Sequence, residues 1–409
     1  MRRRLAAHQV TAGQAVPVAD GAEPAVLALA AERFGLTVLE RLGTGGSDSI
    51  CALARDATDR LVVVKCLRGS AGRVDGHGLG TFRAKQRQQE LLTAVAPGVG
   101  DRYATLLRAE HGRGWSAYVL EHCPYPPLVD TARQGDPAVF SAVLRAVLGS
   151  LIEDGYTQDV RPAPATLWPA MYLGRLARRR WILRWHLPAD LWDSAVLEVN
   201  GRRVGGLDEA SSGADAPAVR ALFADSRLSV PVHGDLNLRN LLADPAPSNA
   251  PAYCLIDPRG TTQPWDVVYD LAKMLFTLTL FDDTMRAGFT VTTDRPGVYT
   301  VGLARPGPLQ RAAAAFVGML PELWQWLRAA GLGNGPWLER LLFAHATHVL
   351  AESACRLSDR ADPLPVRLNR ALGLHLYGLL LMTDLLERFR DGADIDITAH
   401  LALTGVPPV

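Results

Sequence analysis

The amino-acid sequence predicts an α+β protein with two lobes, a small one rich in strands followed by a larger, mainly helical one. The chain has 409 residues, which is enough to build two hydrophobic cores. Runs of residues that are typical of strands gather early, at 37–42, 61–66 and 115–121. Beyond a proline-rich break at 123–127, the apolar residues follow helical spacing instead.

The first lobe is predicted to span 36–122, after an extension at 1–35. The end of that extension, at 23–34, has the composition of a short helix. A glycine-rich turn leads from the first strand to a returning strand at 50–54, and helical spacing at 85–95 follows the third strand. This lobe is expected to be the nucleotide-binding one.

The second lobe is predicted to span 123–409 and to carry the catalytic loop and the acceptor site. Its clearest helical segments are 138–153 and 167–183. Residues 195–205 interrupt the helices with alternating apolar residues around Asn200-Gly201, a pair typical of hairpin turns. We therefore expect an inserted hairpin there, near the substrate, and a loop rich in glycine, proline and threonine at 292–307.

Composition excludes several kinds of partner. The formal net charge of +1 provides no field that would attract nucleic acid or an anionic membrane. The five cysteines are odd in number and form no Cys-x-x-Cys pair, which favours reduced thiols over a disulfide framework or a zinc site. No stretch has the length of a membrane span, and no apolar region follows the basic start, so a cytoplasmic location is expected.

The most informative segment is His233-Gly234-Asp235-Leu236-Asn237-Leu238-Arg239-Asn240. Asp235 stands five positions before Asn240, and another carboxylate, Asp257, ends the apolar run 253–257. A carboxylate can orient and deprotonate an attacking hydroxyl, while amide and carboxylate oxygens are hard ligands that suit Mg²⁺. The pattern predicts phosphoryl transfer from a nucleotide, with Asp235 as the catalytic residue and Asn240 and Asp257 as metal ligands.

This motif, followed by Ile256-Asp257, resembles the aminoglycoside phosphotransferase and choline kinase-like family, which shares the bilobal protein-kinase-like fold. The resemblance to the whole catalytic order covers residues 36–275, and the C-terminal third is similar only in being helical. It implies Mg²⁺ and ATP, or GTP, as cofactors. Many relatives carry a second acidic residue two positions after the aspartate, where this chain has Arg259. That departure is expected to place a cation near the phosphates or near an acidic acceptor.

Lys65 ends a run of three valines, where a lone buried ammonium is costly, so it is expected to be paired or to reach solvent. The resemblance implies that this lysine contacts the α- and β-phosphates. It also implies that a glutamate on the next helix holds the lysine, and Glu90 is the candidate. An ordinary surface lysine and a solvated glutamate are the alternatives.

The turn at 43–49 is a candidate cover for the phosphates. Glycines such as Gly45 and Gly46 let the backbone approach a ligand, and Ser47 or a backbone N–H can donate to phosphate oxygens. The turn has neither a Walker A sequence nor a full Gly-x-Gly-x-x-Gly pattern, and a plain hairpin turn is the alternative.

Other residues are expected to support the site. The backbone between Glu121 and Cys123 is the predicted connector of the two lobes, where related kinases receive the adenine edge. His233 and Asn237 are expected to brace the catalytic loop by hydrogen bonds, the histidine without transferring protons. Asp270 is expected to accept N–H bonds from that loop and to favour the start of a helix.

One predicted helix is rich in cations and indoles: Arg175, Arg178, Arg179, Arg180, Trp181 and Trp185. We favour a solvated face for this helix over a binding site for an anionic acceptor. His345 and His348 share one helix face, but no acidic ligand accompanies them in a metal pattern, so they are interpreted as core or surface histidines.

Taken together, the residues predict an ATP- or GTP- and Mg²⁺-dependent phosphotransferase. Its expected acceptor is a hydroxyl of a small polar metabolite, such as a sugar, an amino sugar or an antibiotic. One alternative is a kinase of Ser or Thr in a peptide or protein. Another is a catalytically silent nucleotide-binding protein, which Arg259 and the incomplete glycine turn favour. The motifs specify neither the acceptor nor an oligomeric state.

Overall fold

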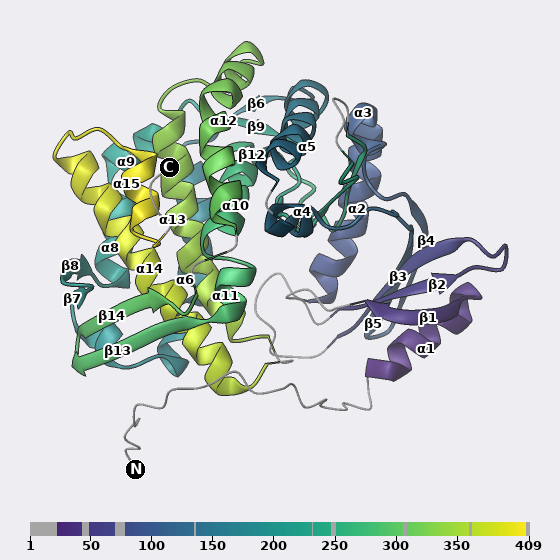
Figure 1. Cartoon of the computed structure of the whole chain (residues 1–409), viewed down its shortest axis with the longest axis horizontal. Helices are drawn as coiled ribbons and strands as arrows, with labels where there is room; N and C mark the ends of the chain where they lie inside the picture. The colour runs from purple at the N-terminus through teal and green to yellow at the C-terminus, as the bar shows by residue number, and fades with distance from the viewer. Residues whose placement is uncertain are drawn as a thin grey trace.

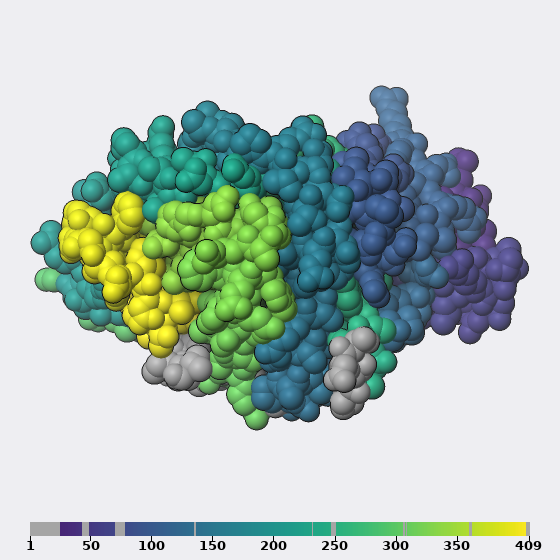
Figure 2. All heavy atoms as spheres, turned by 90° about the horizontal axis from the view of Figure 1, so that it is seen from above, coloured from purple at the N-terminus to yellow at the C-terminus, as the bar shows by residue number. Residues whose placement is uncertain are grey.

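The computed structural model describes residues 23–42, 49–69, 78–134, 136–230, 232–246, 251–305, 307, 309–359 and 362–405. A strand-rich lobe from the first part of the chain stands beside a larger helical lobe (Figure 1). Seen from above, the two lobes occupy opposite ends of an elongated molecule (Figure 2). The predicted α+β class with a small strand-rich and a large helical lobe is confirmed.

The sheet of the first lobe has five antiparallel strands: β1 (Thr37–Leu42), β2 (Ile50–Arg55), β3 (Leu61–Arg68), β4 (Leu106–Gly112) and β5 (Trp115–Glu121). Their order is β1-β2-β3-β5-β4, so β3 lies at the centre. Strand β4 was not predicted from the sequence. It lies at the edge of the sheet and is mostly half-buried or exposed, so it shows no alternation of apolar residues.

Two helices cover the faces of this sheet. Helix α1 (Glu23–Phe34) packs on one face, and helix α2 (Leu79–Val95) packs on the other, between the sheet and the helical lobe (Figure 1). Phe82 of α2 packs against Tyr118 of β5 with ring centroids 4.8 Å apart. This apolar contact in the first turn explains why α2 begins six residues before the helix predicted at 85–95.

The helices outside the first lobe, in chain order, are α3 (Pro97–Gly100), α4 (Leu128–Gln134), α5 (Pro137–Ser150), α6 (Gly174–His186), α7 (Asp190–Asp193), α8 (Leu207–Ala214), α9 (Pro217–Leu222), α10 (Val268–Thr279), α11 (Asp283–Ala287), α12 (Gln310–Ala329), α13 (Trp337–Arg356), α14 (Leu364–Arg390) and α15 (Ile397–Ala402). Two π-helical turns, η1 (Leu151–Tyr156) and η2 (Trp168–Leu173), continue α5 and precede α6. Within the part of the chain that is described, no helix combines the length and apolarity needed to cross a membrane.

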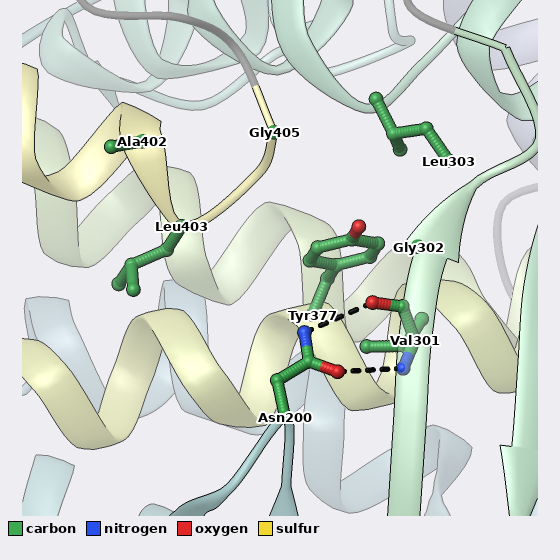
Figure 3. A pocket seen from close by; sticks show the side chains of 8 residues that line it. All are labelled: Asn200, Val301, Gly302, Leu303, Tyr377, Ala402, Leu403 and Gly405. Carbon is green, nitrogen blue, oxygen red and sulfur yellow. Dashed lines mark hydrogen bonds between the residues drawn. The ribbon is translucent and has the colours of Figure 1, made fainter.

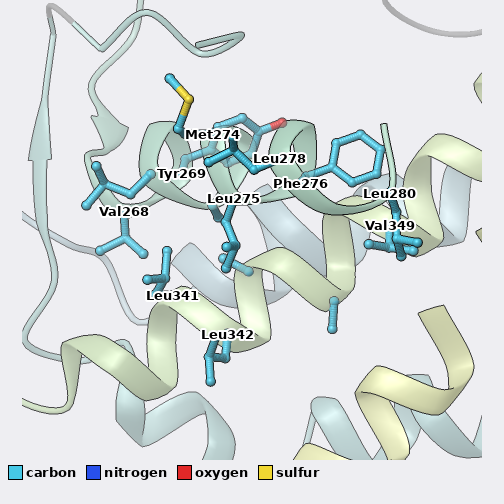
Figure 4. Close-up of a cluster of buried hydrophobic side chains, with 14 of the residues drawn as sticks. Val268, Tyr269, Met274, Leu275, Phe276, Leu278, Leu280, Leu341, Leu342 and Val349 are labelled. Atoms are coloured by element: carbon cyan, nitrogen blue, oxygen red, sulfur yellow. The ribbon is translucent and has the colours of Figure 1, made fainter. Parts of the chain in front are cut away.

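The core of the helical lobe is centred on α10, which is buried at every position. Figure 4 shows its apolar side chains, including Leu275 and Phe276, packed against Leu341 and Val349 of α13. Helix α13 packs in turn against α14. Burial on all sides fixes the position of α10, and its first two turns carry two of the polar side chains that build the site, Asp270 and Lys273.

Small sheets complete the lobe. A two-stranded sheet pairs β10 (Leu241–Ala243) with β11 (Tyr253–Leu255). A three-stranded sheet joins β6 (Arg161–Pro162), β9 (Arg227–Ser229) and β12 (Trp265–Asp266). The third has the order β13-β14-β7-β8 and contains β7 (Val196–Val199), β8 (Arg202–Gly205), β13 (Phe289–Arg295) and β14 (Val298–Leu303).

The hairpin expected at 195–205 is formed by β7 and β8, with Asn200 and Gly201 at positive φ of 52° and 74° in the turn. Two expectations around it were wrong. Much of the segment at 292–307 forms the β13–β14 hairpin instead of a loop, because threonine and valine alternate well enough to pair with β7. The β7–β8 hairpin also lies at the end of the helical lobe that is far from the first lobe (Figure 1).

Candidate active site

The predicted catalytic loop, residues 233–240, is bound by the first turn of α10. The carboxylate of Asp270 accepts hydrogen bonds from the backbone N–H groups of His233 (2.8 Å) and Gly234 (2.7 Å), and from the Tyr156 hydroxyl (2.8 Å). Burial raises the pKa of this carboxyl above its usual range, although these donors and His233 favour its charged form. Asp270 therefore joins the loop to the most buried helix of the protein.

Gly234 is required by a close approach of two loops. Its φ is +77°, and a Cβ atom there would lie 2.7 Å from Cβ of Arg259. The backbone N–H of Arg259 donates to the carbonyl of His233 at 3.0 Å, which joins the catalytic loop to the segment after β11. A side chain at position 234 would separate these two segments.

His233 links the same two segments through both nitrogens of its imidazole. Its Nδ1 accepts a hydrogen bond from the backbone N–H of Asp235 (3.1 Å), and its Nε2 donates to the carbonyl of Ile256 (3.0 Å). The tautomer with the proton on Nε2 satisfies both contacts. The ring is fully buried and both of its nitrogens are occupied by backbone groups, an arrangement that suits a brace better than a proton carrier.

Two asparagines set the shape of the loop. Asn237 Oδ1 accepts from the backbone N–H groups of Arg239 (3.0 Å) and Asn240 (3.2 Å). Asn240 Nδ2 donates to the carbonyl oxygen (2.9 Å) and to Oδ2 (3.2 Å) of Asp235. The carbonyl of Asn240 accepts from the N–H of Ile256 at 3.0 Å. Asp235, Asn240 and the residue before Asp257 are therefore joined directly.

Asp257 lies where the first lobe meets this loop. Its Oδ1 is 2.6 Å from Nζ of Lys65 in β3 and 2.8 Å from Nζ of Lys85 in α2. Burial by itself would raise the pKa of this carboxyl, but the two ammonium groups hold it well below its usual range. Asp257 also has a φ of +56°, a conformation that is uncommon outside glycine and is often found at functional sites.

Lys65 is paired as the sequence led us to expect, but its partner is not Glu90. Burial would lower the pKa of the Lys65 ammonium, and Asp257 beside it raises that pKa well above its usual value. Glu90 is exposed, and its carboxylate accepts a hydrogen bond of 3.5 Å from Gln86 on its own helix. Among the described side chains, the residue of α2 that points toward Lys65 and Asp257 is Lys85, so the expected pairing with Glu90 was wrong.

Gln88 is a site residue that the sequence analysis did not identify. It is fully buried, one turn after Lys85, and its Nε2 donates to the carbonyl of Val232 at 2.8 Å. Its Oε1 accepts from the backbone N–H groups of Gly260 (2.6 Å) and Thr261 (2.9 Å). One side chain of the first lobe thus holds both the catalytic loop and the loop after Asp257 in the second lobe.

Lys273 is another residue that was missed. Its Nζ lies 3.2 Å from Oδ1 of Asp235 and 3.5 Å from Oε1 of Glu352 in α13. Burial would lower the pKa of this ammonium, but Asp235 and Glu352 raise it. The Asp235 side chain is 30% exposed, so it is reached by solvent on one side and held by a buried cation on the other.

Composition offered one way to find these lysines. Of the 43 Lys and Arg residues in the chain, only three are lysines, namely Lys65, Lys85 and Lys273. All three bind the two carboxylates that the motif singled out: Asp257 has two, and Asp235 has one. Because this chain otherwise uses arginine as its cationic residue, a lysine indicates a position that favours a compact point charge.

Arg259 occupies a different environment from the one expected. Its guanidinium lies over the rings of Trp265 and Tyr269, 5.5 and 5.2 Å from their centroids, and donates to the Tyr269 hydroxyl. The aromatic rings hold this cation against the start of α10. The cation that accompanies Lys65 at Asp257 is Lys85.

The side chains of Glu121 and Cys123, in the predicted connector, contact other residues of the protein. The Glu121 carboxylate binds Arg60 at 2.6 Å and accepts from the Thr105 hydroxyl at 2.8 Å, so its side chain serves the lobe itself. A hydrogen bond from Cys254 of β11 lowers the pKa of the Cys123 thiol to about 7. Gly45, Gly46 and Ser47 lie outside the described residues.

The cationic helix is only partly solvated, contrary to expectation. Arg175 and Arg179 of α6 are buried, because they face the core formed by α10 and α13. Arg175 donates to the Tyr269 hydroxyl, and Arg179 donates to the carbonyl of Ala351 at 2.9 Å. The outward face carries the exposed indoles Trp181 and Trp185.

Other features do not add to the site. His345 and His348 are buried in α13, and burial lowers the pKa of both well below the usual value, so they are core histidines. No group of three or more His, Cys, Asp or Glu side chains is arranged for metal binding in the described segments.

A hollow of about 380 Å³ beside β14 and α15 is lined by none of the predicted catalytic residues. Asn200 bridges to the backbone of Val301 there (Figure 3).

Comparisons with known proteins show a distant likeness. No protein-family model matches it, and no curated protein matches it. Among solved structures, an aminoglycoside 3′-phosphotransferase of type VIII is similar, with 17% sequence identity and a TM-score of 0.43 over 80% of this chain and 98% of that chain. A likeness this distant assigns neither a family nor an activity.

Proposed function

We propose that this protein is a phosphotransferase that moves the γ-phosphate of ATP or GTP to a hydroxyl of a small polar metabolite, with Mg²⁺ as cofactor. The observation that carries the proposal is the junction of three segments distant in sequence. Asn240 bonds to Asp235 and to the residue before Asp257, while Lys65 binds Asp257 from the other lobe. Phosphoryl transfer needs this combination of a carboxylate, hard oxygen ligands and a phosphate-binding cation.

The side-chain oxygens of Asp257 and Asn240 are hard ligands of the kind that fit a magnesium ion. Lys65 and Lys85 make their nearest approaches to Oδ1 of Asp257, and the Asn240 amide donates to Asp235 through Nδ2. Asn240 and Asp257 would hold the ion, which would neutralise charge on the phosphate chain when bound.

The chain's own residues supply the remaining functions. Lys65, kept protonated by Asp257, would bind phosphate oxygens. Asp235 would orient the acceptor hydroxyl and accept its proton, with Asn240 and Lys273 holding the carboxylate in place. His233, Asn237 and Asp270 would keep the loop rigid through their backbone contacts.

One observation favours the alternative of a silent nucleotide-binding protein. Asp257 is already bound by two ammonium groups, so a metal ion must compete with them for this carboxylate. Under this alternative the cleft would bind a nucleotide without transferring its phosphate.

Phosphate transfer from labelled ATP, and separately from GTP, tests the proposal. Sugars, amino sugars and aminoglycosides would be offered beside Ser- and Thr-containing peptides, with Mg²⁺ present. We expect transfer to at least one small molecule, and about a 10²- to 10⁴-fold loss in Asp235→Asn. Asp193→Asn is the matched control, because Asp193 is exposed on the short helix α7.

The other outcomes are equally informative. Transfer to peptides alone would replace the acceptor class with a protein hydroxyl. Nucleotide binding without transfer to any acceptor would support the silent alternative. Equal transfer by wild type and Asp235→Asn would remove the catalytic role of that carboxylate.

A further inference from the structure

Lys85 lies in an environment that a structural ion pair does not explain. Lys65 and Lys85 both approach Oδ1 of Asp257, at 2.6 and 2.8 Å, so their two ammonium groups lie next to each other. Their side chains are only 11% and 16% exposed. Like charges this close, and this poorly screened by water, repel strongly. A single lysine would be enough to neutralise Asp257.

The neighbouring groups do not balance the second charge. Tyr118 and Cys51 lie opposite Lys65 in the sheet, and burial raises the pKa of both, so they stay neutral at physiological pH. Gln88, one turn further along α2, is uncharged. Among the described side chains, Asp257 is the carboxylate paired with these two lysines, and the group carries an excess of one positive charge.

The composition of the chain also singles out the lysine at position 85. The sequence uses 40 arginines and three lysines, and the other exposed or half-exposed cations of α2, Arg83 and Arg87, are arginines. The half-buried Lys85 departs from this use of arginine at the point of the helix that contacts Asp257. Phosphate oxygens bind compact ammonium groups as well as guanidinium groups, and they would supply the missing negative charge.

We propose that Lys85 is a second phosphate-binding cation, which lets the site around Asp257 hold the polyphosphate chain of a nucleotide without a divalent metal. This inference rests on the proposed function, because it takes the same nucleotide as ligand. The ammonium of Lys85 occupies part of the coordination of Asp257, so phosphate and Lys85 attract one another while Lys85 and Mg²⁺ compete for the carboxylate. Metal-free nucleotide binding is therefore a property that the Lys85–Asp257 contact predicts and the catalytic motif does not.

Binding of ATP by the full-length protein, measured calorimetrically in excess EDTA and again with saturating Mg²⁺, tests the inference. We expect the wild type to bind ATP in EDTA. Lys85→Met should weaken that metal-free binding by about ten- to a hundredfold, the usual effect of losing one charged hydrogen bond. Arg87→Met, which removes an exposed cation from the same helix, should change it less than about twofold.

The measurement of ATP binding with saturating Mg²⁺ distinguishes a loss of phosphate binding from a folding defect. Lys85→Met should still bind ATP within several-fold of wild type when Mg²⁺ is saturating, because removal of Lys85 leaves Asp257 to the metal. The gain in affinity on adding Mg²⁺ should thus be larger in the variant than in wild type. A uniform loss of binding in both conditions would overturn the inference, since it would make Lys85 a general structural residue.

The remaining outcomes separate this inference from the proposed function. If wild type binds ATP only with Mg²⁺, or if Lys85→Met binds it in EDTA as tightly as wild type does, the role of Lys85 is wrong and the phosphotransferase proposal stands. If wild type binds neither ATP nor GTP in either condition, both fail together.

Discussion

The two lobes differ in how they arrange charge around the candidate site. On the side of the first lobe, Lys65 and Lys85 converge on the single carboxylate of Asp257. On the side of the helical lobe, Lys273 lies between Asp235 and Glu352. That glutamate is also bound by Arg356 at 3.1 Å and Arg175 at 3.7 Å, and Arg356 binds Asp359 at 3.0 Å, so three cations and three carboxylates are joined. The first arrangement has more cations than anions, whereas the second is a chain of alternating charges.

This difference separates binding from positioning. A poorly solvated excess of positive charge is costly until an anion arrives, so under the proposed function the first side would bind one. An alternating chain is already neutralised and holds each member at a defined place, which suits a carboxylate that must meet an acceptor hydroxyl in one geometry. Substitutions on the two sides should therefore affect different measurements.

The sharpest test exchanges each carboxylate for its amide. Asp257→Asn leaves two buried ammonium groups without a counter-charge and should lower the free energy of unfolding by about 3–5 kcal/mol. Asp235→Asn should change stability little and cost turnover instead. Chemical denaturation of both variants beside wild type measures the first effect. Equal destabilisation by the two substitutions would break the comparison.

Lys273→Met should separate turnover from binding. It removes the buried partner of Asp235, so we expect phosphate transfer to fall by about ten- to a hundredfold. ATP affinity in EDTA should stay within about twofold of wild type, the reverse of the pattern expected for Lys85→Met. Steady-state kinetics and calorimetry on the two variants provide the contrast, and a loss of metal-free binding in Lys273→Met would contradict it.

Gln88→Leu tests whether the first lobe positions the catalytic loop. The substitution would leave the backbone groups of Val232, Gly260 and Thr261 without their partner, at a cost of about 2–4 kcal/mol in unfolding free energy. Gln86→Leu is the control, because Gln86 is also largely buried but bonds to Glu90 of its own helix. Thermal unfolding should separate the two variants, and similar melting temperatures would show that Gln88 does not join the lobes.

Acid should destabilise the helical lobe through a buried histidine. This is the smallest of the four effects predicted for the two lobes. Burial lowers the pKa of His375 to about 4, and it has no hydrogen-bond partner for either ring nitrogen among the described residues. The unfolded chain would protonate this histidine near pH 6.5. Above that pH the histidine is neutral in both the folded and the unfolded chain, so it adds no pH dependence there, and stability falls as pH drops from about 6.5 toward 4.

His375→Leu should remove part of that pH dependence. We expect the variant to gain about 1–2 kcal/mol relative to wild type at pH 5, compared with its difference from wild type at pH 8. Urea unfolding at the two pH values measures the difference. A pH dependence identical to that of wild type would mean that His375 is not protonated on unfolding in this range.

Much of the site could be predicted from local sequence. The spacing of Asp235 and Asn240 and the strand before Asp257 specify chemistry within a few residues, and backbone contacts of His233 and Asp270 follow from the loop they brace. The strands β3 and β5 were equally clear, because β-branched residues in a short buried run favour strand. Strand β4 was not, since an edge strand has no apolar alternation to show.

The rotation of helix α2 about its axis could not be predicted from local sequence. Lys85 and Glu90 are five residues apart, so about 140° of rotation separates them around the helix axis. The inward face of α2 carries Gln86, Gln88 and Gln89 beside few apolar residues, and the hydrophobic pattern therefore does not set the rotation of the helix. Packing of Phe82 beneath the sheet sets it, and it turns Lys85 inward and Glu90 toward solvent.

The sequence by itself predicted the kind of chemistry, from residues whose spacing along the chain indicates their roles, and it determined the α+β class through the change from strand to helix patterns. Only the tertiary structure decided which cations meet which carboxylates. Lys65, Lys85 and Lys273 come from three elements far apart in the chain, and their charges act through space. Their distances from Asp257 and Asp235 follow from how β3, α2 and α10 pack, which no local pattern records.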